Sequence, residues 1–187
     1  MRSGGRPAAA PVTGGVVVRP AAAGDVARMR AVSAAAGRRF AEVDDSRIAE
    51  RADDPPIHVE GLTAWVAAGR AWVAVDAGVV AGFLVADVVD GDTHVEEVSV
   101  DPAAQGRGIG TALLAAVAEA AAGWGSGSVT LTTFRDVAWN RPFYERRGYV
   151  VLGPEEIGPE LAARVRDEAA AGLDPALRVC MRRPPSG

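Results

Sequence analysis

The chain has 187 residues, of which 49% are apolar, and this is enough for one domain with a hydrophobic core of ordinary size. Its 24 acidic residues and 20 arginines give a formal net charge of −4, spread along the chain, which argues against a nucleic-acid-binding face or a basic membrane-binding patch. A single cysteine, Cys180, and two distant histidines exclude an internal disulfide and a cysteine-based metal site, so we expect no metal and a reducing, cytoplasmic location.

Periodic apolar positions and turn residues divide the first half of the chain into seven elements. They are, in order, a strand at 16–20, helices at 26–40, 45–51 and 62–68, and strands at 71–75, 79–89 and 93–100. Asp25 is placed to cap the first helix with its side chain. The two turns that join the three consecutive strands are rich in Asp and Gly, which hairpins favour, so these strands should form an antiparallel meander.

The second half of the chain predicts three more helices and three more strands. They are a helix ending near 122, a strand at 129–134, a helix at 139–147, a strand at 149–152, a helix at 159–170 and a strand at 177–181. The whole order predicts an α/β fold, a mixed and mostly antiparallel sheet with helices on both faces.

The two ends of the chain are predicted to be tails around this single domain. Residues 1–15 lack the apolar segment of a secretory signal, and no apolar run approaches the roughly 20 residues that span a bilayer. We therefore predict a flexible tail at 1–15, one domain at 16–183 and a short tail at 184–187. The absence of lysine beside many Ala, Gly and Arg residues is typical of a GC-rich bacterial genome.

The loop between strand 93–100 and the helix that follows has the composition of an anion-binding site. Gly106, Gly108 and Gly110 let backbone N–H groups turn toward one point, and the first helical turn adds unpaired donors and the positive end of its dipole. That turn has no acidic side chain, so the anion should come from a ligand. A Walker loop needs a lysine, and a dinucleotide fingerprint needs G-x-G-x-x-G, whereas these glycines run G-x-G-x-G.

A second stretch with chemical potential is WNRPFYERRGYVVL, residues 139–152. Asn140 is placed to cap a helix, Pro142 falls in its first turn and Gly148 ends it. Asn140 and Tyr144 are four residues apart and therefore share one face of that helix.

These two stretches resemble the acyl-CoA-binding segments of the GNAT superfamily of N-acetyltransferases. Gln105, Gly108 and Gly110 match its pyrophosphate loop, [QR]-x-x-G-x-[GA], and Tyr144 and Gly148 keep the spacing of its second segment. The predicted order of elements is also that of the GNAT fold from about 16 to 183, with the helix at 159–170 as an addition. The resemblance implies acetyl-CoA as cosubstrate, no metal, and direct attack of an amine on the thioester while both substrates are bound.

The resemblance also implies a CoA-binding set of residues. Backbone N–H groups of Val98 and Val100 would bind the pantetheine and the acetyl carbonyl, and the backbone of residues 105–111 would bind the pyrophosphate. The complete set is Val98, Ser99, Val100, Gln105, Gly106, Arg107, Gly108, Ile109, Gly110, Thr111, Asn140, Phe143 and Tyr144. Arg107 is either a phosphate contact or a solvated loop residue, and Asn140 is either a pantetheine contact or only a helix cap.

Tyr144, His94 and Glu97 are the candidate catalytic residues. By resemblance, Tyr144 lies near the CoA sulfur, where a phenol with a pKa of about 10 can protonate the departing thiolate. Its alternative role is a structural tyrosine packed beside Phe143.

A base is expected because a lysine-like amine, with a pKa near 10.4, must lose a proton before it attacks. His94 and Glu97 fall at positions where family members carry such a group, and Glu96 or a water molecule stays open as an alternative. Because strand side chains alternate, we expect His94 and Glu96 on one face of the strand and Val95 and Glu97 on the other.

We therefore predict an acetyl-CoA-dependent N-acetyltransferase acting on a primary amine of a small molecule or an amino-acid-like acceptor, with no nucleic-acid or membrane partner. This function predicts a closed acceptor pocket under the helices at 26–40 and 62–68. A protein N-terminal or lysine acetyltransferase, which would have an open groove, and a non-catalytic acyl-CoA sensor remain alternatives. The sequence leaves open the acceptor, the acyl group and the choice between a monomer and a homodimer.

Overall fold

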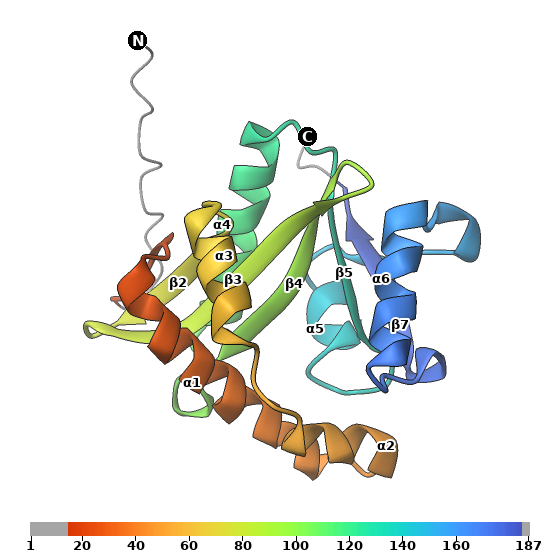
Figure 1. Ribbon diagram of the computed structural model, residues 1–187, viewed down its shortest axis with the longest axis horizontal. Coiled ribbons are helices and arrows are strands. Elements are labelled where there is room, and N and C mark those ends of the chain that lie inside the picture. Colours follow the sequence, from red (N-terminus) through yellow and green to blue (C-terminus); the bar gives the residue numbers. More distant parts are fainter. Residues whose placement is uncertain (1–14, 185–187) are drawn as a thin grey trace.

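The structure, a computed structural model, describes residues 15–184 and is built on one seven-stranded sheet (Figure 1). Its strands are β1 (Val17–Pro20), β2 (Ala71–Asp76), β3 (Val79–Val89), β4 (Asp92–Val100), β5 (Val129–Phe134), β6 (Val150–Val151) and β7 (Arg178–Arg183). Its α-helices are α1 (Val26–Gly37), α2 (Ser46–Ala49), α3 (Val59–Ala67), α4 (Ile109–Gly123), α5 (Arg141–Glu145) and α6 (Pro159–Ala170). The tails predicted at the two ends lie, except for Gly15 and Pro184, outside the described residues.

The sheet has the strand order β1-β2-β3-β4-β5-β7-β6. Every neighbouring pair is antiparallel except β4 and β5, which are parallel, so the predicted mixed and mostly antiparallel sheet is confirmed. β4 and β5 pair only from Thr93 to Val95, opposite Val129 to Leu131, although both strands continue beyond these residues. The two strands therefore separate in the middle of the sheet, and one edge of β4 from Glu96 to Val100 has no strand beside it.

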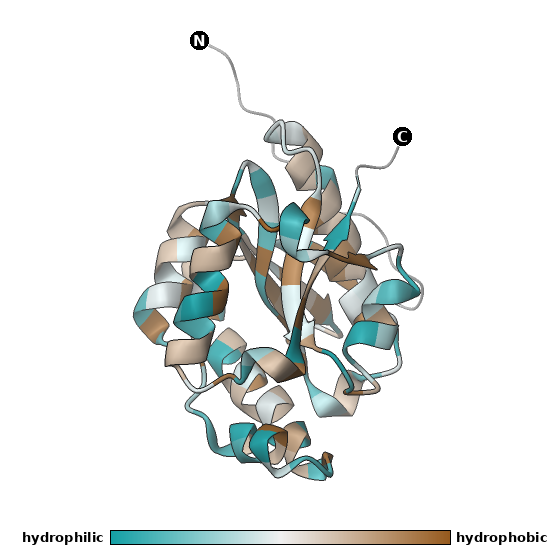
Figure 2. Ribbon diagram, turned by 90° about the vertical axis from the view of Figure 1, so that its right-hand side faces the viewer, coloured by the Kyte–Doolittle hydropathy of each residue, from teal (hydrophilic) through white to brown (hydrophobic). Residues whose placement is uncertain are grey.

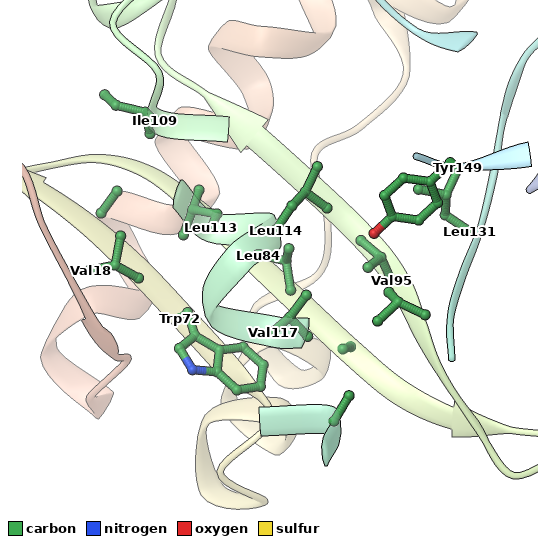
Figure 3. Close-up of a cluster of buried hydrophobic side chains, with 14 of the residues drawn as sticks. Val18, Trp72, Leu84, Val95, Ile109, Leu113, Leu114, Val117, Leu131 and Tyr149 are labelled. Atoms are coloured by element: carbon green, nitrogen blue, oxygen red, sulfur yellow. The ribbon is translucent and has the colours of Figure 1, made fainter. Parts of the chain in front are cut away.

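One face of the sheet packs against α4. Leu113, Leu114 and Val117 of this helix are at most 1% exposed and contact Leu84 of β3 and Val95 of β4 (Figure 3). Burying a leucine or valine side chain stabilises the fold by roughly 1.5–3 kcal/mol, so these contacts hold α4 and the loop before it firmly on the sheet.

The opposite face is covered by α1, α3 and α6. Met29 of α1 and Leu62 of α3 are fully buried against Phe83 of β3, and Leu161 of α6 packs against Cys180 of β7. In Figure 2 the apolar residues concentrate on the central strands, and the polar residues lie mainly on the outer helices and loops. Within the described residues, no helix combines the length and apolar character needed to cross a membrane.

The structure corrects the expected helix caps. Asp25 closes a short 3-10 turn that precedes α1; its carboxylate accepts the N–H of Ala22 at 2.8 Å and pairs with Arg19, so the prediction of a side-chain cap on α1 is wrong. The helix predicted at 139–147 is the shorter α5, and the side chain of Asn140 makes no cap hydrogen bond. The strand predicted from residue 177 begins at Arg178 because residues 175–177 form a 3-10 turn.

A β-bulge at Glu96 changes the direction of the side chains of β4. Val85 of β3 lies opposite Glu97, whereas the next residue, Ala86, lies opposite Val95, so Glu96 is an extra residue in β4. Both glutamates consequently point to the face of α1 and α6: Glu96 pairs with Arg164 of α6, and Glu97 bonds with a serine of α1. The prediction that Glu97 shares a face with Val95 is wrong, because simple alternation takes no account of a bulge.

Candidate active site

A cavity of about 1050 Å³ opens where β4 and β5 separate. Its walls come from β4, the glycine loop with the start of α4, β5, α5, α1 and the segment that follows α1. The predicted site residues that line it are Glu97, Val98, Ser99, Val100, Gln105, Gly106, Gly108, Ile109, Gly110, Thr111, Asn140, Phe143 and Tyr144. The structure thus brings the two motifs together around one space, although 29 positions or more separate them in the sequence. His94 and Arg107 are not among the lining residues.

The glycine loop meets α4 at a left-handed residue. Gly108 has a φ of +79° and immediately precedes Ile109, the first residue of α4. The first N–H groups of the helix have no carbonyl partner within it, and no acidic side chain lies in its first turn. Gly110 lets α5 approach, because a Cβ there would lie 3.1 Å from Cζ of Phe143. The loop therefore presents unpaired donors and a positive dipole end to the cavity.

The free edge of β4 presents backbone donors to the same space. The N–H of Asp101 donates to the carbonyl of Ala81, 2.8 Å away, on the side of β3. Successive N–H groups of a strand point to opposite sides, so the N–H groups of Val98 and Val100 point toward the opening between β4 and β5. They lie where a carbonyl or an amide of an extended ligand can pair with them.

Tyr144 of α5 reaches the cavity from the side of the second motif. Its ring makes edge contacts with Phe143 and Tyr149, with centroids 5.2 and 5.7 Å away, and its hydroxyl makes no hydrogen bond to a described residue. Burial raises the pKa of Tyr144 to about 12. The phenol therefore stays protonated at every physiological pH and offers a free donor.

His94 has the surroundings of a structural residue. It is 2% exposed, and its Nδ1 lies 2.9 Å from Oγ1 of Thr130 on β5. Burial, with a further contribution from Arg164, lowers the pKa of His94 to about 4. The imidazole is thus neutral and lies behind the wall of the cavity.

Glu96 and Glu97 both line the cavity, but only one has a cation beside it. Glu96 lies 3.2 Å from the guanidinium of Arg164, and burial raises the pKa of its carboxyl against the effect of that charge. Glu97 accepts a hydrogen bond of 2.7 Å from Ser99 and has no ion-pair partner in the part of the chain that the structure describes. Burial raises the pKa of Glu97, and hydrogen bonds from Ser99 and Ser33 oppose the shift.

The end of the cavity farther along β5 is bounded by an apolar cluster. Its members come from the segment after α1, the end of β5, the loop before α5 and the loop after α6: Phe40, Val43, Ile48, Phe134, Val137, Trp139, Leu173 and Leu177. An ion pair of 2.8 Å between Arg47 and Asp174 joins the same segments. The predicted contribution of α3 is wrong, because Leu62 holds this helix on β2 and β3. In its place the cavity is lined by Arg51, Asp54, Pro55, Pro56 and Ile57.

A sequence model of the acetyltransferase (GNAT) family matches residues 39–149, which include the glycine loop, the second stretch as far as Tyr149 and most of the cavity wall. The chain belongs to the GNAT acetyltransferase family.

Solved GNAT structures share the fold at low sequence identity. N-acetylglutamate synthase from Neisseria gonorrhoeae, complexed with coenzyme A and N-acetyl-glutamate, has a TM-score of 0.67 at 18% identity; the match covers 93% of this chain but only 36% of that one. PaiA N-acetyltransferase from Thermoplasma acidophilum, in complex with coenzyme A, has a TM-score of 0.66 at 14% identity, with 90% and 98% covered. The ribosomal-protein-S18-alanine N-acetyltransferase from Escherichia coli has a TM-score of 0.63 at 17% identity, with 92% and 95% covered.

Of two arginines near the glycine loop, the one that lines the cavity is Arg147 and not Arg107. Arg107 pairs with Asp76 at the end of β2 and points away from the cavity. Arg147, which sequence reasoning did not select, lines the cavity; it donates to Oγ1 of Thr111 at 2.9 Å and lies 3.5 Å above the ring of Phe143. The sequence shows two adjacent arginines, Arg146 and Arg147, near the end of the second stretch, and this is its one sign of a basic group there. Which of the two faces the glycine loop depends on packing: Arg147 lines the cavity and Arg146 is exposed. No group of three metal-ligating side chains occurs within residues 15–184.

Proposed function

We propose that this GNAT protein transfers an acetyl group from acetyl-CoA to the primary amine of a small molecule or an amino-acid-like acceptor, by direct attack in a ternary complex. The glycine loop and the free edge of β4 fit an extended thioester that ends in a pyrophosphate. Coenzyme A is bound in solved structures of the same fold, which supports this cosubstrate.

The observation that carries the choice of a small acceptor is the apolar cluster beyond β5. Phe40 contacts Phe134 and Trp139, with ring centroids 5.2 and 6.4 Å apart, so the segment after α1 reaches across to β5 and the loop before α5. A protein substrate would need an open groove along this side. The cluster and the Arg47–Asp174 ion pair lie across it, which favours an acceptor that fits inside the cavity.

The protein's main tasks in this reaction are alignment and the stabilisation of negative charge on the thioester oxygen. The N–H groups of Val98 and Val100 would hold the pantetheine and the carbonyl. Glu97 would accept the proton of the acceptor amine, directly or through water, because its pKa is raised and no cation among the described residues pairs with it. His94 is too deeply buried for this role, and Glu96 is paired with Arg164.

Tyr144 would act on the departing sulfur as a hydrogen-bond donor. A thiol has a pKa of about 8.5, so a phenol with a pKa of about 12 is the weaker acid, and complete proton transfer from it is unfavourable. A hydrogen bond to a developing thiolate has no such requirement. This role is milder than the general-acid role that the sequence predicts.

We expect Tyr144→Phe to lower kcat by about 10-fold, less than the roughly 100-fold or more that loss of a general acid would cause, while the KM for acetyl-CoA changes by less than about threefold. The substitution removes only the hydroxyl and keeps the ring contacts with Phe143 and Tyr149. Steady-state kinetics with acetyl-CoA as the varied substrate measure the two effects. A change in KM alone would remove Tyr144 from the reaction step.

Arg147 would contribute to the binding of the CoA phosphates. Its guanidinium lies beside Thr111 in the first turn of α4, where the unpaired N–H groups of the loop converge. We expect Arg147→Met to raise the Kd of acetyl-CoA by about 10-fold, which corresponds to about 1.4 kcal/mol. Calorimetric titration at low and high salt measures the change, and Arg146→Met, at an exposed neighbouring position, is the control. Equal losses in both variants would mean that only the overall charge matters.

The decisive experiment for this function is a screen for CoA release with acetyl-CoA and a panel of small primary amines, amino acids and lysine-containing peptides. We expect turnover with small acceptors and none with peptides. Turnover with peptides alone would favour a protein acetyltransferase. Tight acetyl-CoA binding without turnover on any acceptor would favour an acyl-CoA sensor.

A further inference from the structure

One arginine in the wall of the cavity has hydrogen-bonding capacity that the described residues do not use. Arg51 lies in the 3-10 turn Glu50–Asp53, after α2, and its side chain is 20% exposed. Its Nε is buried and has no acceptor within residues 15–184. Its one ionic contact is with Asp54, whose Oδ1 lies 3.5 Å from Nη1. Nη2 makes no hydrogen bond to a described residue either, so the guanidinium keeps donors that a further group can use.

The other arginines that line the cavity differ from Arg51 because each has a close partner. Arg178 pairs with Glu168 at 3.0 Å and bonds to Thr132 at 2.9 Å. Arg39 donates to Oε1 of Gln105 at 3.0 Å and lies over the ring of Trp139. Arg147 is bonded to Thr111, as described above. Among the arginines that line the cavity, Arg51 is therefore the one with a buried Nε that has no acceptor within residues 15–184.

Two neighbours lie on the Nη1 side of the Arg51 guanidinium. Asp54 is 3.5 Å from Nη1, and a Cβ added to Gly172, in the loop after α6, would be 3.2 Å from the same atom. Nε itself is buried, so the end of the guanidinium that carries Nη2 is the part left for another partner. A guanidinium edge with two parallel N–H groups matches the two oxygens of a carboxylate better than it matches any neutral group.

We infer that the acceptor carries a carboxylate as well as its amine, and that Arg51 binds this carboxylate. The inference rests on the proposed function. It gives the cavity two recognition points of opposite charge: Glu97, in the wall formed by β4, for the amine, and Arg51 for the acid. The acceptor class is therefore an amino acid or a related amine that bears a free carboxylate.

Binding of products to the CoA complex tests this assignment without the need to know the natural acceptor. The probes are the N-acetyl derivatives of the 20 common amino acids and their carboxamides, which differ only in the charge of the acid group. Each is titrated calorimetrically into the wild-type protein saturated with CoA. We expect at least one N-acetylamino acid to bind about 10-fold or more tightly than its carboxamide.

Three variants identify the residue responsible. Arg51→Met should remove the preference for the acid and Arg51→Lys should keep part of it, because lysine retains the charge but not the planar fork. Arg38→Met is the control, because Arg38 is an exposed arginine of the same segment that does not line this cavity. It should leave the preference for the acid unchanged. The Kd of CoA should be equal in all four proteins, which shows that each is folded.

The outcomes separate this inference from the proposed function. Failure of the wild-type protein to bind CoA would overturn both. Binding of CoA with no N-acetylamino acid preferred over its carboxamide would overturn the role of the carboxylate, and the same is true if no probe binds. Retention of the full preference by Arg51→Met would overturn the assignment to Arg51. Turnover of simple amines in the screen above would then leave the acetyltransferase function standing.

Discussion

Replacing Gly108 by aspartate is expected to raise the Kd of acetyl-CoA at least about 100-fold, which corresponds to about 2.7 kcal/mol. Gly108 is the residue before the first turn of α4, where aspartate is a favoured helix cap. The new carboxylate would accept the N–H groups that the pyrophosphate needs and would repel its charge. The φ of +79° strains any side chain at this position, although aspartate tolerates the left-handed region better than most residues.

Two controls separate the effect of charge from backbone strain. Gly125→Asp introduces the same side chain at a similar φ of +72°, in the loop after α4, where an added Cβ would meet no heavy atom within 4 Å. It should leave acetyl-CoA binding unchanged. Gly108→Asn can cap the helix but adds no charge. It should compete for the same N–H groups without repelling the pyrophosphate, so its Kd for acetyl-CoA should lie between those of the wild type and Gly108→Asp. Thermal unfolding should show little destabilisation in any of the three, and unchanged binding by Gly108→Asp would refute the assignment of the loop.

Local patterns were sufficient to predict most of the fold. The bounds of β3, β5 and α6 agree with those read from apolar spacing and turn residues, because each element has strong signals at both ends, such as Pro159 at the start of α6. The conformation of the glycine loop was equally predictable, since the left-handed Gly108 and the start of α4 depend on residues adjacent in the sequence.

The features that the sequence did not reveal depend on contacts between distant segments. The bulge at Glu96 exists only in the register between β3 and β4, and it reverses the expected face of Glu97. The apolar cluster joins Ile48 to Val137 and Leu173, which no local pattern connects. His94 was a candidate base because it falls where family members carry such a group, but burial lowers the pKa of its imidazole to about 4.

Glu97→Gln is expected to lower kcat by about 100-fold, the lower end of the contribution of a general base. The amide keeps the size of the side chain and can still accept the hydrogen bond from Ser99, so only the capacity to take a proton is lost. Glu96→Gln is the matched control at the adjacent position. Because Arg164 also contacts Asp87, 3.3 Å away, this variant should keep kcat within about fivefold of the wild type. The reverse result would make Glu96 the base, and small losses in both would leave the proton to water.

The pH dependence of the Glu97→Gln variant distinguishes a base from a binding residue. Burial raises the pKa of Glu97 above its ordinary value of 4.5, so the wild-type rate should fall as the pH drops through that raised value, and this limb of the pH–rate profile should be absent from the variant.

The stability of the wild-type fold should change with pH in the opposite sense to the rate. Between pH 4.5 and the raised pKa, the folded protein holds a proton that the unfolded chain releases, so ionisation at higher pH destabilises the fold. Because a glutamine cannot ionise, the Glu97→Gln variant should unfold at neutral pH at a temperature equal to or above that of the wild type. It should nevertheless be the slower enzyme. A purely structural role for Glu97 would not produce this combination.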